Sequence, residues 1–277
     1  MFSQEFMRNA LLAGTFVALA CGVGGWFVVL RGQVFAGDAL SHVAFPGALA
    51  AAAAGLDERV GLLAATVAGG AGIGLLGRGA LAGRGARGSA AVPADDTTIG
   101  IAFTFILGLG VFFLTLFSMG SGGVAGIVAA HTLFGSIFGL GSGEALLTAA
   151  LATGAAVVVL AISRPLLFAS VAPEVAAARG VPTRLLGVCF LAVVGVIAAA
   201  AAQAIGALLL LGLLTVPAAS AHRAARSPFA GIALAGLLAV AAMWGGLTLA
   251  YMLPWLPPST AVVAVAALIY WASRILT

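Results

Sequence analysis

Two ionisable side chains inside an apolar stretch are the residues best suited to chemistry in this sequence. They are Asp38 and His42, in the run Gly-Asp-Ala-Leu-Ser-His-Val-Ala-Phe-Pro-Gly that covers 37–47. On a helix, a spacing of four puts both side chains on one face, about 6 Å apart along the axis. A carboxylate and an imidazole are ligands that zinc, manganese and iron accept. The pair therefore predicts half of a binding site for a divalent transition metal.

One such pair supplies only half of a coordination shell. A two-fold dimer around a central pore would add a second Asp38 and a second His42 and so complete the site. The alternative is a structural ion pair, in which a protonated His42 satisfies Asp38. Ionisable groups are costly within apolar spans, so each interpretation gives the pair a reason to be there.

The elements that must position this pair are long apolar runs. Of the 277 residues, 63% are hydrophobic and only 7% are charged, whereas soluble domains have about 25% charged residues. A soluble monomer of this composition would expose too much apolar surface, and the chain is too apolar for disorder. One span with its turn takes about 30 residues. The sequence predicts one all-α domain over 1–277, a polytopic transmembrane helix bundle of about 8–9 spans.

The expected spans alternate with short polar breaks. Segment 119–143 is rich in Gly and Ser and too broken for a span, which indicates a re-entrant or interfacial piece. Stretches 78–96 and 164–184 are expected to be polar loops. The expected spans are 9–30, 37–55, 60–77, 98–118, 145–163, 185–202, 204–221, 229–252 and 259–275.

The arginines indicate which span ends face the cytoplasm. All 12 basic Lys or Arg residues are Arg, and the net charge is +4. Most of them fall in 31–33, 78–96, 164–184, 222–227 and the C-terminal end. Nine spans with the N-terminus outside put all these segments inside. Arg8 does not fit, so an even number of spans with both ends inside stays open.

The arginines are scattered rather than clustered, so nucleic-acid binding is not indicated.

The expected cytoplasmic loop 164–184 contains the signals of a short helix. Pro173 suits the first helical position, and Glu174 suits the positive end of the helix dipole. Arg179 suits the last turn, and Gly180 can take the left-handed cap. Two interpretations stay open, an ordinary interfacial loop and a lever on which a soluble partner pushes.

The sequence carries no catalytic motif. It contains no Gly-x-x-x-x-Gly-Lys phosphate loop and no nucleophile–base arrangement, so the chain is not expected to be an enzyme or to hydrolyse ATP itself. Cys21 and Cys189 lie in apolar runs and indicate neither a disulfide framework nor a zinc motif. No cofactor is expected in this chain.

Four blocks follow one another along the chain. They are the Arg, polar bend, Gly-Asp-Ala-Leu-Ser-His and Pro-Gly of 31–47, the acidic-plus-Ile-Gly block of 95–100, the Leu-Phe-Gly of 133–135, and the Gln-x-x-Gly to Pro-Ala-Ala run of 203–221. Together they resemble the membrane permease subunit of bacterial zinc, manganese and iron ABC importers, the ABC-3 family. The likeness covers nearly the whole chain. It departs at Ala172, where the family usually has the Asp of Asp-Pro-Glu.

The resemblance implies a homodimeric permease of the bacterial inner membrane that imports a divalent metal. The imidazole favours zinc, while an Asp-His pair also accepts manganese and iron. The resemblance further implies two copies of a cytoplasmic ATP-binding subunit, which would bind the ATP, and an extracytoplasmic metal-binding protein. An ion-gradient-driven secondary transporter or channel for divalent metals is the alternative.

The resemblance also assigns roles to the two candidate sites. Asp38 and His42 would be the metal contacts beside the pore. Loop 170–180 would form the helix that couples to the ATPase, and Ala172 would deprive that helix of its N-cap. The residues expected to carry the coupling are Pro173, Glu174, Ala177, Arg179 and Gly180.

Overall fold

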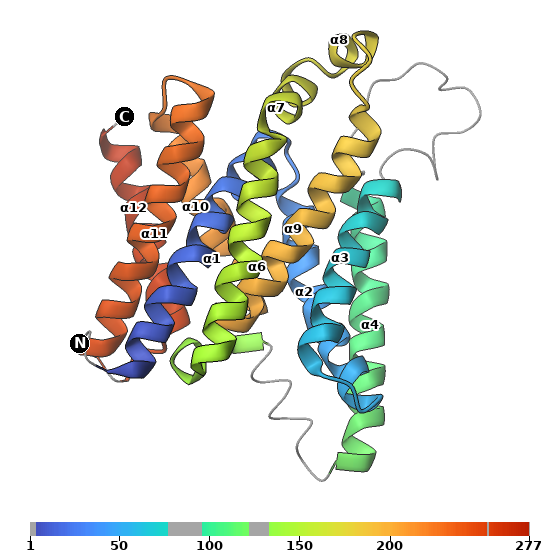
Figure 1. Ribbon diagram of the computed structural model, residues 1–277, viewed down its shortest axis with the longest axis vertical. Helices are drawn as coiled ribbons and strands as arrows, with labels where there is room; N and C mark the ends of the chain where they lie inside the picture. Colours follow the sequence, from blue (N-terminus) through green and yellow to red (C-terminus); the bar gives the residue numbers. More distant parts are fainter. Residues whose placement is uncertain (1–3, 77–95, 122–132, 254, 277) are drawn as a thin grey trace.

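The computed structural model describes residues 4–76, 96–121, 133–253 and 255–276. These residues form helices joined by turns, with no strand among them (Figure 1). The helices are α1 (Glu5–Leu30), α2 (Val34–Ala53), α3 (Glu58–Leu76), α4 (Asp96–Ser121), the 3-10 helix η1 (Ile137–Gly139), α6 (Ser142–Ala161), α7 (Ser163–Val171), α8 (Pro173–Ala178), α9 (Thr183–Ile205), α10 (Ala207–Ala224), α11 (Pro228–Met252) and α12 (Pro258–Leu276).

The long helices agree with the expected spans. Within the described residues, seven helices are long and apolar enough to cross a membrane, namely α1, α2, α4, α6, α9, α11 and α12. Helices α3 and α10 are 19 and 18 residues long and coincide with two further expected spans. The prediction of an all-α, polytopic helix bundle is therefore confirmed.

The ends of the helices lie at two opposite faces of the bundle. Figure 1 shows the α1–α2 turn, α7, α8, the α10–α11 turn and the C-terminal end of α12 at one face, which we call the α8 end. The beginning of α1 lies at the other face, which we call the N-terminal end. This grouping is the one expected for nine crossings with most arginines on one side.

Helix α7 corrects the expectation of a polar loop over 164–184. Pro165 lies in the first turn of α7, where a missing N–H breaks no helical hydrogen bond. Leu166 and Ala169 are buried, so packing on the bundle fixes a helix that the polarity of the sequence conceals. The segment therefore consists of two short helices, α7 and α8, followed by the start of α9.

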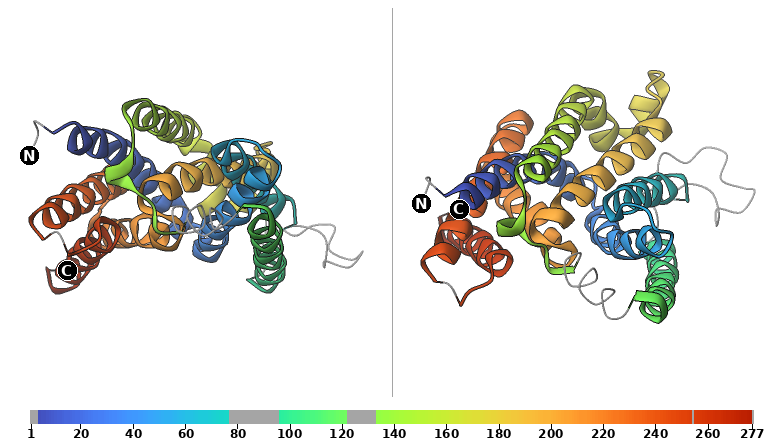
Figure 2. Two further views of the ribbon diagram at one scale, coloured as in Figure 1. Left: turned by 90° about the horizontal axis from the view of Figure 1, so that it is seen from below. Right: turned by 60° about the horizontal axis from the view of Figure 1, so that its bottom comes forward.

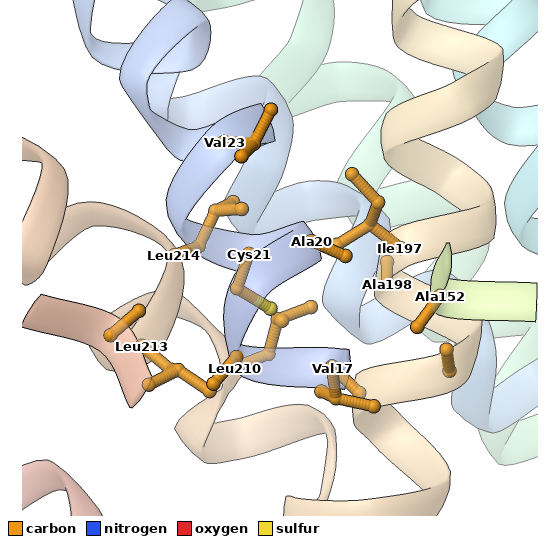
Figure 3. Packing of buried hydrophobic residues seen from close by; sticks show 14 of the residues in the cluster. Val17, Ala20, Cys21, Val23, Ala152, Ile197, Ala198, Leu210, Leu213 and Leu214 are labelled. Carbon is orange, nitrogen blue, oxygen red and sulfur yellow. The ribbon is translucent and has the colours of Figure 1, made fainter. Parts of the chain in front are cut away.

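Helix α1 is the centre of the bundle, and α4 lies at its periphery. Helix α1 packs against α6, α9, α10 and α11. Of the most apolar stretch of α1, 72% is buried inside the bundle, whereas only 12% of the corresponding stretch of α4 is buried. Helix α4 is therefore free to face lipid. Figure 2 shows α4 at the edge of the molecule, beside α2. In Figure 3, Cys21 of α1 lies among Leu210, Leu213 and Leu214 of α10, while Ala20 faces Ile197 of α9.

Two glycines let segment 133–136 dock directly on the α9–α10 junction. Gly135 has a φ of +70°, and Gly206 has a φ of +89° with a ψ of 154°. A Cβ on Gly206 would lie 2.4 Å from the carbonyl oxygen of Leu133, and one on Gly135 would lie 2.4 Å from the backbone nitrogen of Gly206. The two backbones therefore touch with no side chain between them. Of the segment expected to be re-entrant or interfacial, 119–121 completes α4, and residues 122–132 lie outside the described part.

We expect Gly206→Ala to destabilise the protein by about 2 kcal/mol or more, because this backbone conformation is essentially restricted to glycine. The added methyl group would also push the two backbones apart. The thermal unfolding midpoint of the detergent-purified protein measures the effect. Gly154→Ala is the matched control, since a Cβ there meets nothing within 4 Å in helix α6. Equal midpoints for the two variants would contradict the direct backbone contact.

Candidate metal half-site and coupling segment

Asp38 and His42 lie on one face of α2, as their spacing predicts. Oδ1 of Asp38 is 3.9 Å from Nε2 of His42, and the two side chains are 30% and 21% exposed. This distance is too long for a hydrogen bond. A metal ion bonded to both atoms at about 2.2 Å needs them no more than about 4.4 Å apart. The observed separation therefore fits two ligands of one ion.

An aromatic ring on α4 and a backbone carbonyl without its helical donor lie beside His42. The ring of Phe103 on α4 stands edge-on to His42, with the ring centroids 5.2 Å apart. Pro46 lies inside α2 and has no N–H to donate to the carbonyl oxygen of His42, its normal helical acceptor. This feature was not predicted, although the four-residue spacing of His42 and Pro46 is visible in the sequence. It adds a carbonyl oxygen to the polar atoms near the pair.

The pair lies in the half of α2 that is nearer the α8 end. Asp38 is the fifth and His42 the ninth of the 20 residues of α2. At about 1.5 Å per residue, Asp38 lies roughly 6 Å and His42 roughly 12 Å from the first residue of the helix. His42 is therefore near the middle of the helix and Asp38 one turn closer to the α8 end.

Within the described residues, the pair is not joined by a third metal-binding side chain. No group of three or more His, Cys, Asp or Glu side chains that could hold a metal ion occurs in this part of the chain. His131, in the Gly-rich segment, lies outside the described residues. One copy of the chain thus offers a carboxylate and an imidazole at this place, which is half of a four-ligand shell.

The expected coupling segment forms α8, which projects from the α8 end (Figure 1). Pro173 occupies the first turn, and Glu174 is the acidic residue of that turn. Ala172 is the N-cap and provides no side-chain hydrogen bond, as the sequence predicts. Ala176 is buried, while Glu174 and Ala177 are exposed. Val175 and Ala178 are exposed as well, so the outer surface of α8 consists of one carboxylate among small apolar side chains, and Ala176 packs against the bundle.

The C-terminal end of α8 has the expected glycine cap. Gly180 has a φ of +80°. Its N–H donates to the carbonyl of Ala177 at 3.0 Å, and the N–H of Val181 donates to that of Ala176 at 3.0 Å. This pair of bonds is the Schellman motif. Arg179 differs from the expectation: it is the exposed C-cap residue, one position beyond the last turn.

Two further polar residues bond to helices distant in the sequence. The hydroxyl of Thr148 on α6 donates to Oε1 of Gln203 on α9 at 3.3 Å and so links these two helices. His222 lies in the last turn of α10. Its ring stacks on that of Trp26 at 4.7 Å and 11°, and its Nε2 lies 2.9 Å from the Trp26 carbonyl oxygen.

Long apolar helices form this bundle, and one of them carries an ionisable pair. A short helix, α8, projects from one face. These features are typical of a membrane-spanning transport subunit. Comparison with known proteins identifies its family. The ABC 3 transport family model matches residues 3–277, and the chain belongs to that family. The resemblance noted in the sequence is thereby confirmed.

Named relatives and a solved structure agree with this assignment. The manganese transport system membrane protein MntC of Halalkalibacterium halodurans is 28% identical over 80% of this chain and 70% of that protein. The manganese import system permease protein ScaB of Streptococcus parasanguinis is 27% identical over 90% of this chain and 83% of that protein. The structure of PsaBC from Streptococcus pneumoniae in complex with Fab superimposes with a TM-score of 0.80 at 25% identity, covering 98% of this chain and 91% of that one.

Membership of this family fixes what kind of subunit the chain is. It is a multi-pass protein of the bacterial inner membrane and a permease subunit of an ABC transporter. It is not an enzyme, because ATP is bound by a separate subunit of such transporters.

Proposed function

We propose that this chain is one transmembrane domain over 1–277 that forms the metal pathway of an ATP-driven importer of divalent transition metals. The observation that carries the proposal is the Asp38–His42 pair, partly exposed on a mainly apolar helix with Oδ1 and Nε2 3.9 Å apart. Charged or chargeable groups in a membrane span are costly, and transport is a function that explains their presence.

The incomplete shell supports a homodimer. A two-fold axis repeats every ligand, so two copies would present two carboxylates and two imidazoles to one ion. The partial exposure of both side chains, at 30% and 21%, leaves room for a ligand or for a second copy beside α2. The carbonyl of His42, which lacks its helical donor at Pro46, could accept a bond from a metal-bound water.

Manganese is the first candidate for the transported metal, and zinc is the second. Two carboxylates with two imidazoles suit both ions. The imidazole alone favours zinc, whereas MntC and ScaB, the relatives described above, carry manganese in their names.

Helix α8 is the proposed docking element for the cytoplasmic ATP-binding subunit. The residues proposed to carry the contact are Glu174 and Ala177 within the helix, Arg179 and Gly180 at its C-terminal cap, and Pro173, which fixes its first turn. Val175 and Ala178 are exposed beside them. Two such subunits would bind the ATP, one on each copy of the chain. An extracytoplasmic metal-binding protein would dock at the opposite, N-terminal end of the bundle.

The decisive experiment reconstitutes the chain in proteoliposomes with its ATP-binding subunit and its metal-binding protein. Uptake of radioactive manganese, zinc, iron and cobalt is measured with and without ATP. We expect uptake of manganese or zinc that requires hydrolysable ATP. Uptake driven by an ion gradient in vesicles without the ATP-binding subunit would establish a secondary transporter instead, and stimulation of ATP hydrolysis by no metal would overturn the proposal.

A further inference from the structure

Arg31 joins three helices at the α8 end of the bundle. It is the C-cap residue of α1, and its side chain is partly buried. Its Nε donates to Oε1 of Gln33 at 3.0 Å, and its Nη1 donates to Oγ of Ser170 on α7 at 3.2 Å. Its guanidinium carbon also lies 5.7 Å from the ring centroid of Phe190 on α9. One side chain thus contacts the start of α2, helix α7 and helix α9.

The Gln33 contact fixes the beginning of the helix that carries the metal pair. Gln33 is 7% exposed and is the N-cap of α2. Its N–H donates to Val28 at 2.9 Å, and the N–H of Gly32 donates to Val29 at 3.1 Å, which closes the end of α1. The carbonyl of Gln33 accepts from the N–H of Gly37 at 3.1 Å. Asp38 follows one residue later, about 7.5 Å along the axis from Gln33.

The Ser170 contact reaches the coupling segment. The hydroxyl of Ser170 donates to the carbonyl of Leu166 at 2.6 Å, so its oxygen accepts from Arg31 in a chain of two hydrogen bonds. Leu166 is fully buried, which anchors α7 in the bundle. Ser170 lies two residues before Ala172, the shared cap of α7 and α8. Less than one helical turn therefore separates the start of α8 from the residue that bonds to Arg31. We expect a displacement of α8 to move Ser170 and, through it, Arg31.

Arginine has the chemistry for such a link. Its guanidinium is always charged and presents several N–H donors in a rigid plane, so it can hold Gln33 and Ser170 at once. Hydrogen bonds with a charged donor are stronger and more directional than neutral ones. A lysine ammonium has no comparable fork and could not keep both contacts in this geometry.

We propose that Arg31 is a positioning residue that transmits movement of α7 and α8 to α2. It thereby controls the distance between the Asp38–His42 pair of one copy and the same pair of the second copy. The inference rests on the proposed function, because it assumes that α8 docks the ATP-binding subunit and that the pair binds the metal. Arg31 is then the mechanical connection between the docking helix α8 and the metal pair.

Ser170→Ala is the sharpest test, because it removes the link to α7 while Arg31 keeps its contacts with Gln33 and Phe190. Uptake and ATP hydrolysis are measured together in proteoliposomes that contain the whole complex. We expect the metal transported per ATP hydrolysed to fall roughly five- to tenfold. Ser163→Ala, in the same helix, is the matched control and is expected to keep the wild-type ratio, because the hydroxyl of Ser163 donates to the carbonyl of Leu160 near the end of α6.

Arg31 variants separate transmission from simple stabilisation. Arg31→Gln is expected to lower the ratio at least as far as Ser170→Ala, and Arg31→Lys is expected to restore it only in part. The double variant Arg31→Gln/Ser170→Ala should match Arg31→Gln alone, because the two residues form one link. Arg274→Gln, an exposed arginine at the end of α12, serves as the control for lost charge.

The outcomes distinguish this inference from the proposed function. If the wild-type complex takes up no metal with ATP, the proposed function fails and the inference fails with it. If the wild type transports metal while Ser170→Ala keeps its ratio, only the inference is overturned. Additive effects of the two substitutions in the double variant would also overturn it, since they would show that Arg31 and Ser170 act separately.

Discussion

Glu174→Arg is expected to uncouple the transporter, with metal uptake reduced more than about tenfold. Glu174 is exposed in the first turn of α8, where its carboxylate complements the positive end of the helix dipole. A partner surface that accepts this carboxylate must be positive or rich in N–H donors. Reversal of the charge therefore places like charges opposite each other at the proposed interface. Uptake by proteoliposomes and metal-stimulated ATP hydrolysis are the measurements.

Glu5→Arg is the control for the helix itself. Glu5 is also an exposed acid in the first turn of a helix, but α1 begins at the N-terminal end of the bundle. Both substitutions cost a similar dipole interaction, about 0.3–1 kcal/mol. We expect both variants to insert and to purify as the wild type does, and only Glu174→Arg to lose the ATP-binding subunit. Normal uptake by Glu174→Arg would exclude α8 as the docking element.

Features that depend on neighbours in the chain could be predicted from the sequence. The spans follow from the length of the apolar runs, and the shared face of Asp38 and His42 follows from a spacing of four. The left-handed conformation of Gly180 follows from the Pro173–Gly180 pattern of helix start and stop. Each of these predictions needs only local geometry, which holds whatever the rest of the bundle does.

Features that depend on distant residues could not be predicted in this way. Helix α7 looks like a loop because Arg164 and Pro165 begin it, and only the burial of Leu166 in the bundle shows why it is helical. His222 stacks on Trp26, which is 196 positions away in the chain. The bond from Arg31 to Ser170 spans 139 positions.

The metal pair gives the second large expected effect. Asp38→Ala should abolish uptake of every metal, by more than about 100-fold, because removal of even an outer partner of a metal ligand costs 10–100-fold. The substitution leaves only imidazoles in the dimer and deletes the negative charges that offset the cation. His42→Ala leaves two carboxylates, which a hard ion such as manganese accepts better than zinc does. We therefore expect His42→Ala to impair zinc uptake more than manganese uptake.

Asp38→Asn is the control for shape, since it keeps the size of the side chain and removes its charge. We expect it to lose uptake as Asp38→Ala does, while the unfolding midpoint of the purified protein stays near that of the wild type. Recovery of transport in Asp38→Asn would show that packing against α4, rather than charge, is what the position requires.

The double variant Asp38→Leu/His42→Leu decides between a metal site and a structural ion pair. If the two groups only satisfied each other, removal of one would leave the other unpaired within an apolar span, and removal of both would restore stability. Transport would then recover together with stability. A metal site predicts the opposite for transport, because no ligand remains even though the apolar pair packs well in the membrane. Radiometal uptake by the reconstituted complex is the measurement, and substantial uptake by the double variant would refute the assignment of Asp38 and His42 as metal ligands.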